Sequence, residues 1–226
     1  MENGFGQIYY YLSIFQIILN LPDWKNIIYS WHIVCPSLVV AYLLGSIPFG
    51  LLITNVFGKE DIRKIGSGNI GATNVLRTGR RGLAALTLIF DSGKAIIVVW
   101  LSKEYLGPDI TFFTSIFVVI GHIFPIWLKF HGGKGVACFF GVLFCLSLFS
   151  GLISIIIWLI VALIFRFSSL AALVSVFASP ILGYFIGSPK IGSIMLILAL
   201  LVWIRHIKNI QYLILGKENK INLRVS

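Results

Sequence analysis

Small polar residues and glycines gather between Gly66 and Gly71, where the chain reads GSGNIG. Closely spaced glycines let backbone amides approach an anion, and the N-terminal end of a helix over 72–76 would favour a phosphate group. Ser67 and Asn69 add neutral hydrogen-bonding groups, and Arg77 adds a forked cation that suits phosphate oxygens. The segment therefore predicts phosphate binding, with a plain serine-capped turn as the alternative.

A second glycine-rich segment places Lys134 among Gly132, Gly133 and Gly135. It differs from a nucleotide-binding P-loop because Gly135, and not Ser or Thr, follows the lysine, and because no strand precedes it. What remains is flexible backbone beside one ammonium group. Such a loop can bind phosphate, or its lysine can simply orient the chain in a membrane. Neither interpretation implies a nucleotide.

The third polar segment begins at Arg205, where the last apolar stretch ends. His206 and Asn209 lie three residues apart and share one face if the helix continues. His206 could act as a general base, could position a hydroxyl group, or could be a hydrogen-bonded histidine at the membrane interface. Glu218 is the only acidic residue of the tail and could fix the tail through a basic partner.

Asp91 and Lys94 lie inside an apolar stretch. Three residues apart on a helix, they can pair, and either would be unfavourable facing lipid. We expect both to face the interior and to shape or stabilise the structure, whereas His122 is expected to be a packing histidine. The four histidines and three cysteines are too scattered to suggest a metal site, so neither a metal nor another cofactor is expected.

The composition of the 226-residue chain is that of a membrane protein. Charged residues make up only 12% of it, about half the usual share for a soluble domain, and the mean hydropathy is +0.96. The net charge of +10 could suggest nucleic acid, but the charges flank apolar stretches and form no soluble basic face. We therefore expect a lipid bilayer, and no nucleic acid, as the surroundings of this protein.

Apolar stretches after residue 32 predict an all-α, polytopic membrane protein with a compact bundle of about seven transmembrane helices. Residues 136–165 would form about 45 Å of helix, which is too long for one span, so we expect a hairpin that turns near Ser150 and Gly151. Residues 1–32 are read as an N-terminal extension with a short membrane or interfacial helix over 8–21. Residues 33–222 form the membrane domain and 223–226 a tail. The expected spans are 33–56, 83–101, 111–128, two within 136–165, 170–186 and 191–204.

Lys and Arg are distributed unevenly about these spans. Fourteen of the 18 fall in the segments that the hairpin model places on one side, and only two lie in the loops on the other side. Because cytoplasmic loops are enriched in Lys and Arg, we expect the polar segments to face the cytoplasm.

Several motifs, taken together and in order, resemble the bacterial acyl-phosphate:glycerol-3-phosphate acyltransferase family (the PlsY type). The resemblance covers about residues 37–222, leaves the first 36 residues outside, and implies a bundle commonly described with seven membrane helices. The motifs are LGSIPFG at 44–50, IGSGNIGATNVLRT at 65–78, GHIFP at 121–125, GGKGVA at 132–137, and RHIKN at 205–209 followed by GKENKI at 216–221.

The resemblance implies a site as well as an activity. Ser67, Arg77, His206 and Asn209 match functional positions, Gly132–Gly135 matches the loop that binds glycerol phosphate, Ser169 matches a site serine, and Glu218 matches a structural glutamate. The implied reaction moves an acyl chain from long-chain acyl phosphate to sn-glycerol 3-phosphate at a bacterial inner membrane, giving lysophosphatidic acid. An enzyme that makes acyl phosphate is a candidate partner.

The acyl donor can also be argued from what the histidines lack. Acyltransferases that use acyl-CoA or acyl carrier protein commonly carry a His-x4-Asp pair, and none of the four histidines has Asp five residues later. Acyl phosphate is a mixed anhydride with a good leaving group, so the protein must mainly hold two phosphorylated molecules and align one hydroxyl group. The alternative is a transporter or exchanger of a phosphorylated polyol, which intramembrane Asp91 and Lys94 would suit.

Overall fold

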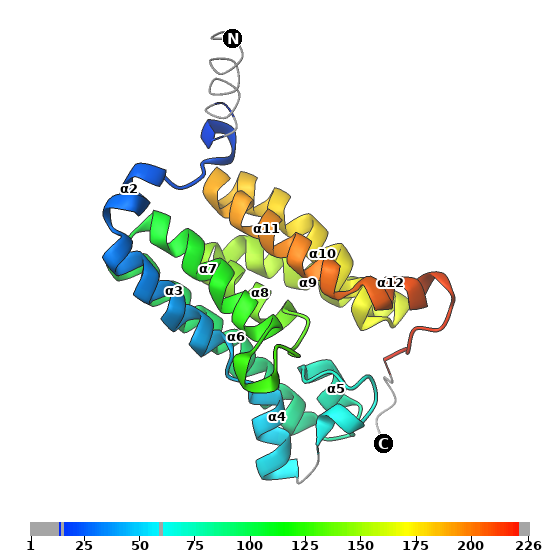
Figure 1. The fold of residues 1–226 in the computed structure, drawn as a ribbon. Helices are drawn as coiled ribbons and strands as arrows, with labels where there is room; N and C mark the ends of the chain where they lie inside the picture. Colours follow the sequence, from blue (N-terminus) through cyan, green and yellow to red (C-terminus); the bar gives the residue numbers. More distant parts are fainter. Residues whose placement is uncertain (1–13, 15, 59–60, 222–226) are drawn as a thin grey trace, which may run out of the picture.

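The computed structural model describes residue 14, residues 16–58 and residues 61–221. Within these ranges the chain forms helices and no strand, as expected of an all-α protein (Figure 1). The α-helices are α2 (Trp24–Tyr29), α3 (Trp31–Gly45), α4 (Phe49–Ile53), α5 (Ala72–Leu76), α6 (Arg81–Tyr105), α7 (Pro108–Ile123), α8 (Val136–Leu146), α9 (Leu148–Phe165), α10 (Ser168–Leu182), α11 (Pro189–Arg205) and α12 (Ile207–Ile214). Short 3₁₀ or π segments are Thr54–Gly58, Ile62–Lys64, Ile126–Leu128 and Gly183–Gly187.

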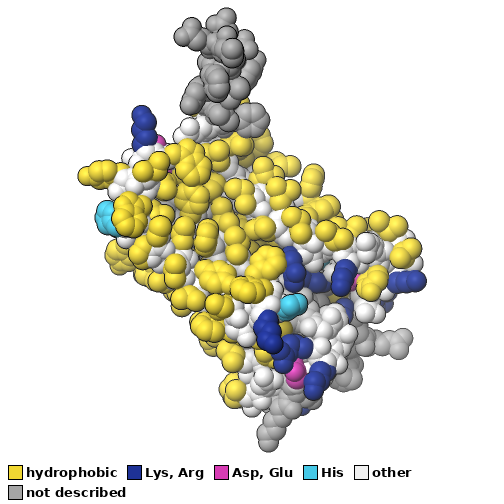
Figure 2. Space-filling model, viewed as in Figure 1, with side chains coloured by type: hydrophobic (Ala, Val, Ile, Leu, Met, Phe, Trp, Pro, Cys, Tyr) yellow, Lys and Arg dark blue, Asp and Glu magenta, His cyan; other side chains and the backbone are white. Residues whose placement is uncertain are grey.

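The length and apolar character of the helices identify an integral membrane protein. Among the described residues, five helices are long and apolar enough to cross a membrane, and the bent pair α11–α12 would make a sixth. The shorter apolar helix α8 adds a further element, so the sequence-based number of about seven is approximately right. Apolar side chains cover most of the face shown in Figure 2, as lipid contact requires.

The first span is broken within the motif at 44–50. Helix α3 ends at Gly45, and α4 begins at Phe49 after Pro48. Close backbone contact locks α3 to α7 near this break, because a Cβ atom on Gly45 would lie 2.1 Å from the carbonyl oxygen of Val118. A Cβ atom on Gly121 would lie 2.2 Å from the carbonyl oxygen of Tyr42. Glycine is therefore required on both helices for this packing.

The expected hairpin within residues 136–165 is present, but its turn is not at Ser150 and Gly151. The chain turns at Ser147, whose extended backbone (φ −151°, ψ 98°) separates α8 from α9. Gly151 lies inside α9, where a Cβ atom would be 2.8 Å from the ring of Phe144. This glycine therefore lets the two helices of the hairpin pack closely, and it does not form the turn.

The hairpin brings the polar segments to one end of the bundle. Figure 1 shows α4, α5, α12 and the connection between α7 and α8 at that end, and α2 at the opposite end. A hydrogen bond confirms the arrangement, since the Thr73 and Ser168 hydroxyl groups are 3.1 Å apart although 95 residues separate them. The helix expected over 8–21 lies largely outside the described residues. So does the tail, residues 223–226.

The N-terminal extension packs on the end of the bundle away from the polar segments. The backbone amide of Asp23 donates to the carboxylate of Asp109 (3.3 Å), which also forms an ion pair with Lys190 (2.5 Å). The hydroxyl group of Ser193 donates to the carbonyl oxygen of Leu19.

Candidate functional site

Asn74 folds the first glycine-rich segment. Its side chain is buried, and its Nδ2 donates to three backbone carbonyl groups at 2.8–3.1 Å. Its Oδ1 accepts from the amide of Ser67 (2.9 Å). The sequence analysis did not single out this residue, although it lies within the motif at 65–78. An amide side chain can satisfy donors and acceptors at once, and this is what a tightly turned loop needs.

The expectation that the amides of this segment bind an anion directly is wrong for three of them. The Ser67 amide bonds to Asn74, the Gly68 amide donates to the carbonyl oxygen of Ile65 (2.9 Å), and the Gly71 amide donates to Oδ1 of Asn69 (2.9 Å). Gly68 has a φ of +70°, so glycine is needed to make the turn. The side chains of Ser67 and Arg77 are both exposed.

The second glycine-rich segment is built for close packing. The amides of Gly132 and Gly133 donate to the carbonyl oxygens of Ile123 and His122, each at 3.1 Å. These two amides are therefore also committed within the protein, contrary to the expectation of free backbone donors. Gly135 has a φ of +87° and precedes α8, so the loop is a fixed turn that presents the side chain of Lys134.

A hydrogen-bonded network joins Lys134 to the C-terminal segment and to α10. The Lys134 ammonium donates to Oδ1 of Asn209 (2.5 Å), and the Asn209 amide donates to both carboxylate oxygens of Glu218 (2.9 and 3.1 Å). The hydroxyl group of Ser169 donates to the same carboxylate (2.9 Å). Glu218 thus holds the tail through neutral partners and not through the basic partner expected. Ser169 joins the network, whereas Ser168 contacts α5.

The surroundings of Lys134 are more basic than acidic. Burial lowers the pKa of Lys134 to about 8, and the nearby guanidinium groups of Arg77 and Arg205 act in the same direction. The Glu218 carboxylate opposes these effects but does not cancel them. Three cations therefore lie near a single carboxylate. An anionic ligand would neutralise this excess of positive charge.

His206 sits where the chain bends. Helix α11 ends at Arg205 and α12 starts at Ile207, and the two helices differ in direction by 60°. His206 caps the N-terminus of α12, and its carbonyl oxygen accepts from the Ile210 amide (2.8 Å), so His206 and Asn209 belong to the first turn of α12 although α11 does not continue straight into it. The Nδ1 atom of His206 lies 2.8 Å from the carbonyl oxygen of Val202. Because a carbonyl only accepts, Nδ1 carries the proton, and Nε2 of the neutral ring can accept one.

Arg205 is a second residue that the sequence analysis did not place in the site. Its guanidinium carbon lies 5.4 Å from the centre of the Phe124 ring. Its Nε is buried and is one of two such side-chain atoms without a hydrogen-bond partner in the described part of the chain. Its position directly before His206 is the feature of the sequence that could have identified Arg205 as a site residue. Lys and Arg side chains gather at this end of the molecule, beside the broad apolar surface (Figure 2).

The C-terminal segment closes over the loop between α9 and α10. The Ile221 amide donates to the carbonyl oxygen of Arg166 (2.6 Å), and Arg166 Nη2 donates to that of Ile221 (3.1 Å). The Lys220 ammonium lies 5.7 Å from the centre of the Phe167 ring. These contacts fix the segment that carries Glu218.

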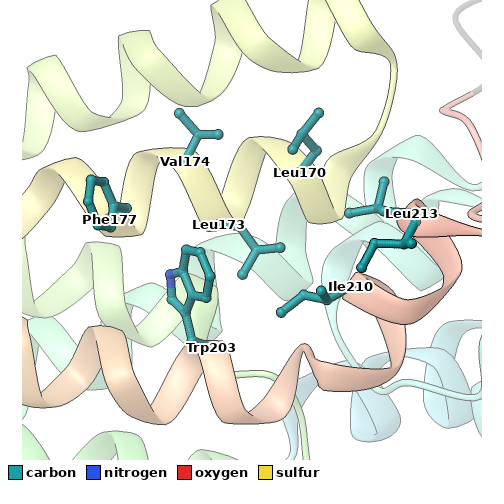
Figure 3. Close-up of a pocket in the computed structure, with 8 residues that line it drawn as sticks. Leu170, Leu173, Val174, Phe177, Trp203, Ile210 and Leu213 are labelled. Carbon is teal, nitrogen blue, oxygen red and sulfur yellow. The ribbon is translucent and has the colours of Figure 1, made fainter.

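An apolar groove of about 380 Å³ lies beside this network, between α10, α11 and α12 (Figure 3). All its walls are hydrocarbon or aromatic side chains. Two of them, Leu170 and Ile210, directly follow the network residues Ser169 and Asn209 in sequence. The lining residues are Leu170, Leu173, Val174, Phe177, Trp203, Ile210, Leu213 and Ile214.

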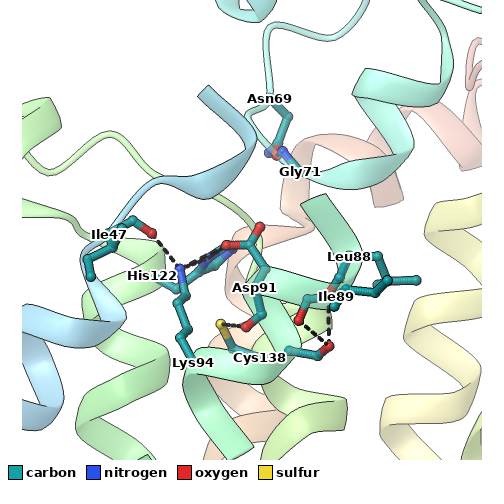
Figure 4. Close-up of polar contacts among 10 residues, drawn as sticks. Ile47, Asn69, Gly71, Leu88, Ile89, Asp91, Lys94, His122 and Cys138 are labelled. Atoms are coloured by element: carbon teal, nitrogen blue, oxygen red, sulfur yellow. Dashed lines mark hydrogen bonds and ion pairs between the residues drawn. The ribbon is translucent and has the colours of Figure 1, made fainter. Parts of the chain in front are cut away.

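Asp91 and Lys94 are paired inside the bundle, as expected, with their charged groups 2.9 Å apart. His122 is buried, as expected of a packing histidine, and it is also part of the same polar cluster (Figure 4). Its Nδ1 atom lies 3.1 Å from the Lys94 ammonium and 3.5 Å from the Asp91 carboxylate.

Comparison with known proteins identifies the family. Residues 35–216 match the family model described as glycerol-3-phosphate acyltransferase. A glycerol-3-phosphate acyltransferase of Mesorhizobium japonicum is 48% identical over 83% of this chain and 96% of its own length. Another, from Rhodopseudomonas palustris, is 46% identical over 82% of this chain and 94% of its own length.

Solved structures agree with these matches. One is the crystal structure of PlsY (YgiH), an integral membrane glycerol 3-phosphate acyltransferase, in its glycerol 3-phosphate form. It has a TM-score of 0.79 to this chain at 34% sequence identity, and the match covers 84% of this chain and 96% of that chain. The lysophosphatidic acid form gives a TM-score of 0.78 at 32% identity, covering 84% and 95%. This chain therefore belongs to the glycerol-3-phosphate acyltransferase family of integral membrane enzymes.

Proposed function

We propose that this acyltransferase moves a fatty acyl group from long-chain acyl phosphate to glycerol 3-phosphate, giving lysophosphatidic acid and phosphate. The observation that carries the proposal is that the basic network and the apolar groove share α10 and α12. Ser169 and Asn209 face the network, and their neighbours Leu170 and Ile210 line the groove. A donor with a phosphate at one end and a long chain at the other fits such a site.

The comparisons support this choice of substrates. PlsY has been solved in a glycerol 3-phosphate form and in a lysophosphatidic acid form, so that protein binds both molecules. Apart from Glu218, the network residues and the groove lie within residues 35–216, which match the family model. Its acceptor and product are therefore proposed to be the same.

The cations are assigned to the two phosphate groups. Two phosphorylated substrates repel each other, and Arg77 and Arg205 lie close enough to Lys134 to act on its charge, so the three cations can offset that repulsion. We assign Lys134 and the Gly132–Gly135 loop to glycerol phosphate. Arg77 and Arg205 would compensate the phosphate that leaves. Ser67 and Asn69 would bind substrate through their neutral side chains.

The reaction needs little activation of the acyl carbon. The hydroxyl oxygen of glycerol 3-phosphate attacks the acyl carbonyl carbon, a new ester C–O bond forms, and the C–O bond to the phosphate breaks. The hydroxyl proton passes to Nε2 of His206 or to the departing phosphate, which is itself a good acceptor. We propose that His206 and Asn209 orient the hydroxyl group, because alignment of reactants supplies most of the rate when the leaving group is good.

The active end is proposed to face the cytoplasm of a bacterial inner membrane. By sequence, fourteen of the 18 Lys and Arg residues fall in the segments that the hairpin model assigns to one side, and such an excess is typical of cytoplasmic loops. Acyl phosphate made in the cytoplasm would reach the groove from that side, and the enzyme that makes it is a candidate partner.

The test is purified protein in lipid vesicles, given labelled glycerol 3-phosphate and one acyl donor at a time. We expect labelled lysophosphatidic acid from long-chain acyl phosphate and none, or far less, from acyl-CoA or acyl carrier protein. Equal rates from acyl-CoA would refute the donor assignment.

The alternative function, transport of a phosphorylated polyol, has less support. The polar groups lie at one end of the bundle, and Asp91 and Lys94 are hydrogen-bonded within it. Family membership also favours an enzyme. Movement of labelled glycerol 3-phosphate across the vesicle membrane, with no new product from any donor, would restore the transporter alternative.

A further inference from the structure

A charged cluster lies within the bundle beneath the Lys134 loop. Asp91 and Lys94 on α6 and His122 on α7 are all buried, with 1%, 7% and 4% of their surfaces exposed. The Lys94 ammonium donates to the Asp91 carboxylate (2.9 Å) and lies 3.1 Å from Nδ1 of His122. Figure 4 shows the three side chains converging from the two helices.

Two further contacts tie this cluster to neighbouring segments. Lys94 also donates to the carbonyl oxygen of Ile47 (2.7 Å), at the break between α3 and α4. The thiol of Cys138, on α8, donates to the backbone carbonyl oxygen of Asp91 (3.0 Å). The His122 ring therefore contacts two charged groups of α6, and these in turn are tied to the break between α3 and α4 and to α8.

The other edge of the His122 ring faces Gly133. A Cβ atom on Gly133 would lie 2.1 Å from Nε2 of His122 and 2.9–3.0 Å from the neighbouring ring carbons. The Gly133 amide donates to the backbone carbonyl oxygen of His122 (3.1 Å). The ring is thus the surface on which this part of the loop rests, and Lys134 is the next residue.

We propose that His122 is a positioning residue for the acyl-acceptor site. Asp91 and Lys94 hold its ring, the ring sets the place of Gly133, and Gly133 sets where the Lys134 ammonium meets the phosphate of glycerol 3-phosphate. The inference rests on the proposed role of Lys134. A small displacement of a binding group can reduce a rate strongly, so the cluster acts on acceptor binding without touching the substrate.

A purely structural role would make a different prediction. Burying charges in a helix bundle costs free energy. Farther along, α6 and α7 are joined by neutral hydroxyl groups instead, since Thr114 and Thr111 of α7 both donate to Ser102 of α6 (2.9 and 3.3 Å). If the charged cluster only held these helices together, its loss would lower stability and leave the affinity for the acceptor unchanged. The hydroxyl cluster supplies a control of that kind on the same helices.

The variant that separates the two roles is His122→Asn. An asparagine Oδ1 can take the place of Nδ1 as the acceptor for Lys94, so the polar cluster keeps its hydrogen bonds, while the ring edge beneath Gly133 is removed. We expect the KM for glycerol 3-phosphate to rise about tenfold or more, since binding depends on alignment of the loop. The KM for acyl phosphate, the protein yield and the melting temperature should change little. The control Thr114→Val should leave the KM for glycerol 3-phosphate unchanged.

A second variant tests the contact itself. Gly133→Ala should raise the KM for glycerol 3-phosphate because its methyl group collides with the ring. In the double variant with His122→Asn the methyl group has room, so the KM should be no higher than with His122→Asn alone. Multiplied effects in the double variant would refute the contact as the cause.

Lys134→Ala, measured in the same assay, distinguishes the positioning role of His122 from the assignment of Lys134 to glycerol 3-phosphate. A raised KM for Lys134→Ala with an unchanged KM for His122→Asn would overturn the positioning role and leave the site assignment intact. An unchanged KM for Lys134→Ala would overturn both.

Discussion

Replacing Lys134 with alanine removes the one ammonium group that the Gly132–Gly135 loop presents. In the structure this group is half-buried and donates to Asn209 at 2.5 Å, so it is already aimed at the network that we assign to the acceptor. We expect the KM for glycerol 3-phosphate to rise and the KM for acyl phosphate to stay nearly constant. Asn209 keeps its bonds to Glu218, so the fold around the tail should persist.

The size of the effect follows from the type of bond that is lost. A hydrogen bond to a charged group contributes about 1.5–3 kcal/mol, which corresponds to a rise in KM of roughly 10- to 100-fold. The lower end is more appropriate here, because Arg77 and Arg205 remain to attract phosphate. The assay is initial-rate kinetics in lipid vesicles with the acyl donor saturating.

The same residue predicts a pH dependence. Burial and the neighbouring arginines lower the pKa of Lys134 to about 8, so the ammonium is charged below pH 8 and is lost as the pH rises through that value. The kcat/KM for glycerol 3-phosphate, which reports the free enzyme, should therefore fall above about pH 8 toward the value of Lys134→Ala. Bound phosphate stabilises the ammonium, so kcat should fall only at higher pH.

Lys134→Arg is the matched control, because a guanidinium group stays protonated throughout this range. Whatever the absolute kcat/KM of this variant, the decline near pH 8 should disappear. If the decline persists in this variant, or if Lys134→Ala retains a normal KM at normal protein yield, the phosphate assignment of Lys134 is wrong.

Glu218→Gln removes the carboxylate that favours the charged form of Lys134, so the decline in kcat/KM should move below pH 8, and a pH profile of this variant measures the shift. Ser67→Ala and Arg77→Ala should each lower turnover in the vesicle assay, and near wild-type rates for both would make the first glycine-rich segment structural. Val174→Trp fills the apolar groove from a partly exposed position and should raise the KM for long-chain acyl phosphate more than that for a short-chain donor, whereas an equal change for both would place the chain elsewhere. The orientation can be tested with single cysteines in a protein without its native cysteines. Cysteines at positions 79, 129 and 219 should resist an impermeant thiol reagent in intact cells, whereas one at position 104 should react. The reverse pattern would invert the proposed orientation.

The sequence by itself determined the helical membrane bundle and the residues that carry chemistry. Apolar stretches must become helices in lipid, because every backbone amide and carbonyl group needs a partner there, so the spans could be read from hydropathy. The distribution of Lys and Arg required a hairpin within residues 136–165, and the structure contains it. The position of the turn was harder to predict, because Gly151 allows close packing as readily as a bend.

Only the tertiary structure decided which polar groups meet and which stay available for a ligand. Lys134 and Asn209 are 75 residues apart, and Ser169 and Glu218 are 49 apart, so no local pattern could pair them. The glycine-rich segments looked like sources of free amides, yet several of those amides are bonded within the protein once the loops close. His122 likewise became part of a charged cluster because the packing of α6 against α7 brings it to Lys94. Local sequence fixes helices through backbone hydrogen bonding, whereas these contacts depend on how whole helices pack.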